Sequence, residues 1–134
     1  MRCEISTCAQ TGCIVWINGP FPAVHWPDLR IARGSLNQLL DAGERCIADG
    51  GYQDRYGPAI TPTGRHECVE RTKAHARARH KTVNGRFKSW GILKQQHRHP
   101  LVKHGRAMHS IAMITQIVIA NRESTWDVVY EDLA

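Results

Sequence analysis

The run from Cys46 to Tyr52 constrains the fold of this chain more than any other stretch. Three apolar residues, Cys46-Ile47-Ala48, precede Asp49, and two glycines then allow a sharp turn before Tyr52. This pattern predicts a short buried strand over Arg45–Ala48 with a carboxylate at its C-terminal end. Strand ends of this kind are where α/β folds commonly place metal ligands and catalytic groups. The partners of Asp49 must then come from the elements around this strand.

An antiparallel hairpin is predicted near the N-terminus. Residues 2–8 alternate in polarity, Gln10-Thr11-Gly12 is a turn signal, and Cys13–Ile17 is an apolar, β-branched run. We expect the second strand to be buried on both faces, and an irregular loop to follow from Asn18 to Pro27. Because a strand begins directly after Met1, we also expect an upstream segment to have been lost.

Three helices are predicted from the spacing of apolar residues. The first begins at Asp28, which occupies an N-cap position, and continues to Leu40. After a loop from Gln53 to Gly64, a long helix is expected over about 65–90. A last, largely buried helix is expected over about 106–120, with Ile114 and Ile117 filling its second side. Val128-Val129-Tyr130 is predicted to be a short strand or a docked tail. The apolar stripe of the long helix comprises Val69, Thr72, Ala76, Val83, Phe87 and Trp90.

This order of elements predicts one α/β domain over residues 1–134 with a mixed sheet and packed helices. The chain is long enough to bury a sizeable core. Its N-terminus shows no secretory signal, and no apolar run reaches the roughly 20 residues of a membrane span. The five cysteines form no C-x-x-C pair. We interpret them as reduced and structural, which favours an intracellular protein.

The charge balance favours an anionic partner such as nucleic acid. The formal net charge is +6 with the eight histidines counted as neutral. At about 100° per residue, Arg77, Lys81, Asn84 and Lys88 cluster on one face of the long helix. The alternative is a solvated basic face with no ligand.

Histidines are concentrated in a basic connector and in the helix that follows it. Four of them could gather a transition metal such as zinc, but their spacing fits no familiar zinc module. Contact with phosphate is an equally suitable role for such a segment. The four candidates are His97, His99, His104 and His109.

Several segments together carry a longer pattern: Ile14–Pro22, Pro27–Leu29, Ala48–Tyr52 and Ala78–Lys88, extended by Gln96–His99 and Ile114–Gln116. Over nearly the whole chain they resemble the C-terminal part of the catalytic domain of Harbinger-like DDE transposases. This DDE superfamily of endonucleases has an RNase H-like fold. The resemblance implies metal-dependent cleavage and transfer of DNA strands, with carboxylates holding Mg²⁺ or Mn²⁺.

The resemblance also implies roles for individual residues. Asp49 corresponds to the second catalytic Asp, and Asp28 to a further acidic position, for which helix capping is the alternative. In the family, an Arg lies four residues before the catalytic Glu and a Lys lies seven residues after it. Arg77 and Lys88 match these two positions, but the residue at the position of the Glu is Lys81 in this sequence. The family's first Asp lies on a strand before the hairpin, and this chain starts at the hairpin.

One catalytic carboxylate of three is therefore expected to remain, in an incomplete RNase H-like domain. The Lys81 ammonium would repel metal ions and could pair with Asp49. Glu70 lies about 16 Å before Lys81 along the helix and cannot replace the missing Glu. The resemblance thus implies a transposase-derived nuclease domain with impaired catalysis, and an intracellular location for which the nucleus is a candidate compartment.

Two alternatives stay open: a non-catalytic remnant that binds nucleic acid, and a degenerate fragment without selected function. Loss of the first strand would leave an open sheet edge, to be covered by two-fold association or by a missing segment. The expected nucleic-acid-binding residues are Arg77, Arg79, Lys81, Arg86, Lys88 and Arg98.

Overall fold

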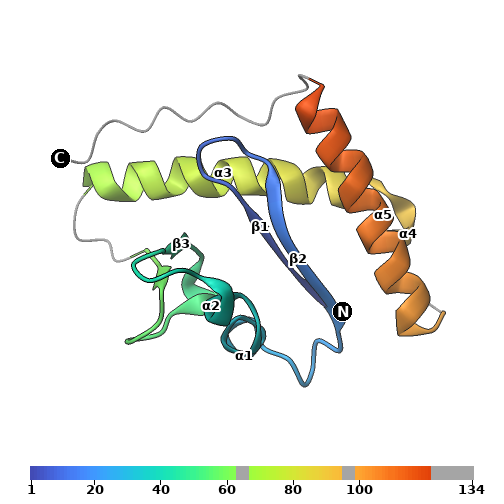
Figure 1. The fold of residues 1–134 in the computed structure, drawn as a ribbon, viewed down its shortest axis with the longest axis horizontal. Helices are drawn as coiled ribbons and strands as arrows, with labels where there is room; N and C mark the ends of the chain where they lie inside the picture. The colour runs from blue at the N-terminus through green and yellow to red at the C-terminus, as the bar shows by residue number, and fades with distance from the viewer. Residues whose placement is uncertain (63–66, 95–98, 122–134) are drawn as a thin grey trace.

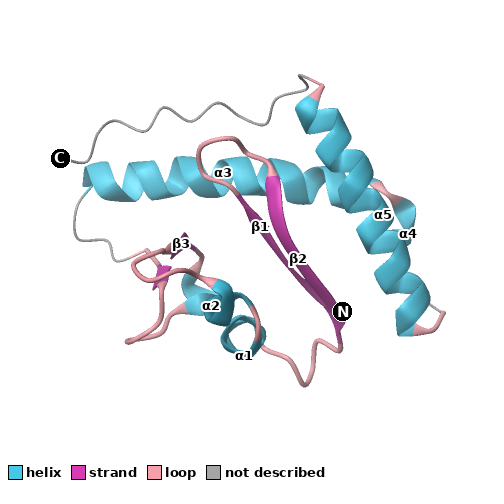
Figure 2. Cartoon of the chain, viewed as in Figure 1, coloured by secondary structure: helices cyan, strands magenta, loops and turns pink. Residues whose placement is uncertain are grey.

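A computed structural model describes residues 1–62, 67–94 and 99–121. The chain is a mixed α/β protein in which helices predominate (Figure 2). The predictions for His97, Arg98 and Val128–Tyr130 lie outside the described residues. The elements in chain order are β1 (Arg2–Thr7), β2 (Ile14–Phe21), α1 (Asp28–Gly34), α2 (Leu36–Leu39), β3 (Cys46–Ile47), a 3-10 turn η1 (Gly50–Tyr52), β4 (Ala59–Ile60), α3 (Glu67–Ser89), α4 (Gly91–Lys94) and α5 (Leu101–Ala120).

The predicted hairpin is confirmed, and its second strand is longer than expected. β1 and β2 pair antiparallel, with Ile5 opposite Ile17 and Arg2 opposite Phe21. Pairing continues past Gly19 and Pro20, which had predicted a loop, because an edge strand tolerates a proline. The prediction that β2 is buried on both faces is wrong, since Val15 is 64% exposed.

The strands form two separate sheets rather than one mixed sheet. In the described part of the chain, β1 and β2 make an antiparallel pair, and β3 and β4 make a parallel pair. β4 arises within the segment predicted to be a loop, where Ala59 and Ile60 supply backbone partners for β3. α3 extends across the molecule past both sheets (Figure 1). The predicted mixed sheet is therefore wrong, because no described strand joins β1 to β3.

The hydrophobic core lies where α3, α5 and the hairpin meet. Val83 and Phe87 of α3 are buried against Met108 and Ile111 of α5. Removing such side chains from water is the main stabilising contribution to a fold of this size. The core is therefore built almost entirely from the hairpin and the two longest helices. Partly buried residues that pack on it are Ile5, Cys13, Ile14, Ile17 and Leu93.

The long helices follow the apolar spacing, with three differences. α5 begins at Leu101, directly after Pro100, several residues earlier than predicted. Ile114 and Ile117 were expected to be buried but are exposed, because no described element covers that side of α5. Trp90 falls just beyond the end of α3 and is also exposed.

The first predicted helix is divided in two at Ser35. The Ser35 hydroxyl oxygen lies 2.7 Å from the backbone oxygen of Ile31 and 2.8 Å from Oε2 of Glu4, and its single proton can be donated to either acceptor. Such side-chain bonds to the backbone compete with helix continuation. Asp28 is not the N-cap, because Pro27 occupies that position and no side-chain capping bond forms. Asp28 instead lies in the first turn of α1, where a negative charge is favourable.

Candidate functional site

A groove of about 850 Å³ lies between β1, the α1–α2 segment, β3 and α3. We call it the β1–β3 groove. It places Asp49, at the end of β3, on the same concave surface as several residues of α3. Among them are Arg77, Lys81 and Asn84, three of the four residues that the helical spacing predicted to share a face. The fourth, Lys88, does not line this groove.

Asp49 and Asp28, the two carboxylates predicted as metal ligands, meet beside Gly51. Oδ1 of Asp49 accepts a 2.9 Å hydrogen bond from the backbone nitrogen of Gly51. A Cβ atom at Gly51 would lie 3.1 Å from Oδ1 of Asp49 and 3.3 Å from Oδ2 of Asp28. A side chain at this position would therefore crowd both carboxylates, and a glycine avoids that contact.

The two carboxylates do not complete a metal centre. Asp28 forms a 2.8 Å ion pair with Nη1 of Arg2, and this guanidinium would compete with a cation for the carboxylate. Across residues 1–62, 67–94 and 99–121, no three His, Cys, Asp or Glu side chains are grouped so as to hold a metal ion. Mg²⁺ bound by protein oxygens needs near-octahedral coordination. The described residues therefore do not fit a two-metal site.

Tyr52 and Glu4 belong to the same region and were not singled out by the sequence. Burial raises the pKa of the Tyr52 phenol, and the carboxylates of Asp28, Glu4 and Asp49 raise it further. Tyr52 is therefore neutral at physiological pH. The strand alternation does place Glu4 on the polar face of β1. The alternation in β1 does not indicate that α1 and α2 cover this polar face.

Lys81 and Arg77 make the α3 wall of the groove basic. Lys81 is exposed, and the ion pairs of the described residues include none between it and Asp49. The expected pairing of these two residues is therefore absent here. Nη1 of Arg77 is enclosed by protein, yet it has no hydrogen-bond partner in the described structure. A buried guanidinium nitrogen without an acceptor is costly, so this wall favours an anionic group.

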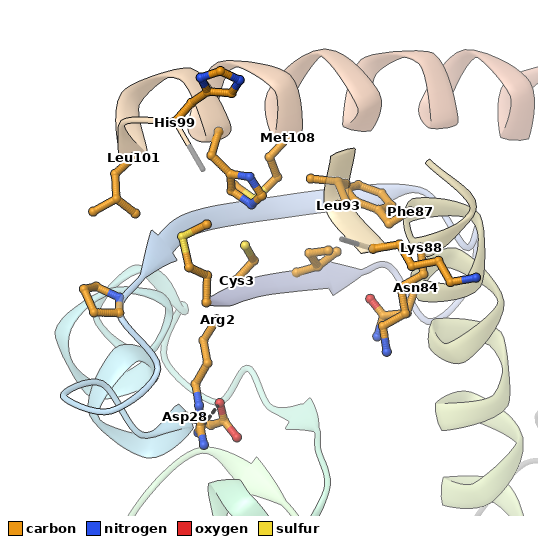
Figure 3. A pocket seen from close by; sticks show the side chains of 15 residues that line it. Arg2, Cys3, Asp28, Asn84, Phe87, Lys88, Leu93, His99, Leu101 and Met108 are labelled. Atoms are coloured by element: carbon orange, nitrogen blue, oxygen red, sulfur yellow. Dashed lines mark ion pairs between the residues drawn. The ribbon is translucent and has the colours of Figure 1, made fainter. Parts of the chain in front are cut away.

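The other predicted nucleic-acid-binding residues have different surroundings. Nη1 of Arg79 donates to the backbone oxygens of Ala9 and Gln10, so this buried side chain anchors the hairpin turn to α3. Arg86 is half-buried on α3. Lys88 is exposed and lines a second cavity of about 1030 Å³ between β1, α3, α4 and α5 (Figure 3). Asn84 lines this cavity as well as the β1–β3 groove and so connects the two.

Two of the described histidines, His99 and His104, line the same cavity, but His109 does not line it. His104 is buried on α5, whereas His99 and His109 are exposed. Residues five apart on a helix point about 140° away from each other, so His104 and His109 face different directions. The described residues therefore offer no basis for the zinc hypothesis.

Comparison of the chain with protein-family models, curated proteins and solved structures found no match. None of the described helices combines the length and the apolar character needed to cross a membrane.

Proposed function

We propose that this chain is an RNase H-like domain derived from a DDE transposase, which binds the backbone of nucleic acid and does not cleave it. The order of elements agrees with part of such a domain: an antiparallel hairpin, a helix, a short strand and a long helix.

The observation that carries the proposal is the placement of Arg77 and Lys81 on the groove wall that also contains Asn84. A nucleic acid carries one negative charge per phosphate, and each lysine or arginine that contacts a phosphate releases a counterion. Lys88 extends this basic surface into the next cavity. Arg79 is left out of the proposed contacts because its guanidinium holds the hairpin turn.

The same placement argues against cleavage. Two-metal phosphodiester chemistry needs several carboxylates converging on the ions. In this groove the position of the family's Glu carries an ammonium, and Asp28 is paired with Arg2. Asp49 alone would not hold two divalent ions. The proposed activity is therefore binding without turnover.

Salt-dependent binding to a fluorescent DNA duplex tests the proposal. The double variant Lys81→Glu/Lys88→Glu should bind more weakly than the original chain. A plot of the logarithm of its association constant against the logarithm of salt concentration should be less steep, with the magnitude of the negative slope reduced by about 2. The matched control is Lys103→Glu/Arg106→Glu on the exposed side of α5, with the same change in net charge.

An equal loss of affinity in both double variants would mean diffuse attraction to a basic protein. No binding by the original chain at low salt would refute the proposal. If the original chain nicks DNA in the presence of Mg²⁺ or Mn²⁺ and Asp49→Ala does not, the domain cleaves DNA and this part of the proposal is wrong.

A further inference from the structure

Two cysteines lie opposite each other where the β1–β2 hairpin ends. Thr7 pairs with Ile14 in the ladder, and the next opposed residues are Cys8 and Cys13. The backbone nitrogen of Cys8 donates a 2.8 Å hydrogen bond to the backbone oxygen of Cys13. Directly opposed residues of an antiparallel pair have Cα atoms about 4.5–5.5 Å apart. A disulfide joins Cα atoms about 4.4–6.8 Å apart, so this separation suits a bond between the two free thiols.

The turn between the two cysteines is held by hydrogen bonds on both of its sides. The nitrogen of Gly12, which has φ +73°, donates to the backbone oxygen of Cys8 at 2.9 Å. The nitrogen of Cys13 donates to Oγ1 of Thr11 at 3.2 Å. Arg79 of α3 donates to two backbone oxygens of the turn, which fixes the turn against the helix (Figure 1). The opposition of the two cysteines therefore depends on the folded hairpin and its contact with α3.

Cys3 offers a comparison within the same hairpin. It precedes Cys8 by five residues, the same spacing that separates Cys8 from Cys13. Because Cys3 lies in the extended strand β1, this spacing places it about 16 Å from Cys8. A disulfide does not span that distance. Equal spacing in the sequence thus gives one close pair and one distant pair in the fold.

The surroundings of Cys8 and Cys13 give the two thiols different reactivity. Cys8 lines the open β1–β3 groove. A hydrogen bond from the Thr11 side chain lowers the pKa of the Cys8 thiol, and the positive charge of Arg79 acts in the same direction. Cys13 is half-buried and packs beside the core. Since peroxides oxidise the thiolate, Cys8 is the thiol that should react first, with Cys13 as its partner.

We propose that Cys8 and Cys13 are a site of reversible oxidation, in which hydrogen peroxide converts the two thiols to a disulfide. The Cys8 thiolate attacks one peroxide oxygen, so that an S–O bond forms, the O–O bond breaks and hydroxide leaves. The Cys13 thiol then attacks the Cys8 sulfur. The S–S bond forms, the S–O bond breaks, and the hydroxyl group leaves as water with the Cys13 proton. The two sulfur atoms together lose two electrons, which the peroxide gains, and a dithiol reductant reverses the change. This inference does not depend on the proposed binding of nucleic acid.

Limited oxidation of the full chain tests the proposal. Hydrogen peroxide is added at neutral pH, the remaining thiols are blocked with iodoacetamide, and tryptic peptides are analysed by mass spectrometry. Residues 3–30 form one tryptic peptide that contains Cys3, Cys8 and Cys13. In the native chain this peptide should have lost two hydrogen atoms and carry one alkyl group, on Cys3. In urea, the Cys3–Cys8 and Cys8–Cys13 bonds close loops of equal length, so both should form in comparable amounts.

Cysteine variants test the two roles separately. In Cys13→Ser the reaction should stop at the sulfenic acid of Cys8, which dimedone traps. In Cys8→Ser the thiol of Cys13 should stay reduced at the same dose of peroxide. Cys3→Ser is the matched control and should keep the full yield of the disulfide.

Four results would overturn the proposal. The first is a native chain that forms the Cys3–Cys8 and Cys8–Cys13 bonds in comparable amounts, because the fold would then not select the pair. The second is a Cys8 that is still alkylated when the half-buried Cys46 has been oxidised. The third is a stable sulfenic acid on Cys8 in the original chain, because Cys13 would then not react with it. The fourth is the absence of a disulfide at a dose that oxidises free cysteine in the same solution.

Discussion

The indole Nε1 of Trp16 donates a 2.8 Å hydrogen bond to Oε2 of Glu4, a carboxylate that is only 2% exposed. The same oxygen accepts from the hydroxyl of Ser35, also at 2.8 Å. Glu4 thereby joins both strands of the hairpin to the junction between α1 and α2. A buried carboxylate needs such donors, because an unpaired charge in this position is strongly unfavourable.

Replacing Glu4 with alanine should lower the free energy of unfolding by about 2–4 kcal/mol, since it leaves the Trp16 indole without its acceptor and the Ser35 hydroxyl with only the backbone oxygen of Ile31. Glu4→Gln keeps an acceptor and should cost less. Urea denaturation measures both values, and the exposed Glu44→Ala is the control. Equal stability of Glu4→Ala and the control would show that these bonds contribute nothing.

Gly85→Ala should stabilise the protein by about 1 kcal/mol, because glycine is a poor helix former within a long helix. No atom lies within 4 Å of the position that its Cβ would take. Gly105→Ala on α5 is the matched comparison. There the added atom would lie 3.2 Å from Cδ of Pro20, so the gain in helix propensity should be reduced or lost. Thermal unfolding of both variants distinguishes them, and a destabilised Gly85→Ala would contradict the packing described for α3.

Cys8 should react with iodoacetamide at lower pH than Cys46. A hydrogen bond from the Thr11 side chain lowers the pKa of the Cys8 thiol, whereas burial raises the pKa of Cys46. The thiolate is the reacting form, so at neutral pH a larger fraction of Cys8 is reactive. Peptide-level mass spectrometry over pH 6–9 measures both rates. Thr11→Val should shift the Cys8 profile to higher pH; faster alkylation of Cys46 in the original chain would contradict this assignment.

Lys81→Glu should introduce affinity for Mn²⁺. The new carboxylate would line the groove together with Asp49, and oxygen ligands of this kind bind Mn²⁺. We expect Mn²⁺ to raise the unfolding temperature of this variant only. Lys81→Gln removes the positive charge without adding a ligand and is the control. If Mn²⁺ raises the unfolding temperature of both variants equally, the cause is the lost repulsion by the Lys81 ammonium and not a new ligand. If Mn²⁺ raises the unfolding temperature of the original chain, the described residues do hold a metal ion.

The sequence predicted correctly those elements that are indicated by the spacing of their own polar and apolar residues. Alternating polarity predicted β1, and helical spacing predicted that Arg77, Lys81, Asn84 and Lys88 share a face, of which the first three line the groove and Lys88 lines the neighbouring cavity. The end of β2 was misplaced because Gly19 and Pro20 usually mark a loop, although an edge strand can hold them.

Contacts between segments that are far apart in the sequence could not be predicted from these local patterns. The carboxylate of Glu4 meets Ser35 only because the α1–α2 junction packs on the hairpin. Likewise, the exposure of Ile117 depends on which elements cover α5, which its own periodicity does not specify. The separation of the strands into two sheets is of the same kind, because pairing partners are set by topology.

The uneven distribution of the core has a consequence for local opening. Between Asp28 and Ile60, the buried hydrophobic residues are Ile31 and Ala32, whereas the hairpin, α3 and α5 share the main cluster. Segments with few buried apolar contacts open at lower free energy than the rest of a protein. Asp49 therefore lies in the part of the chain that should unfold first and be cut first by a protease. A ligand that bridges Asp49 and α3 would act chiefly by suppressing this partial unfolding.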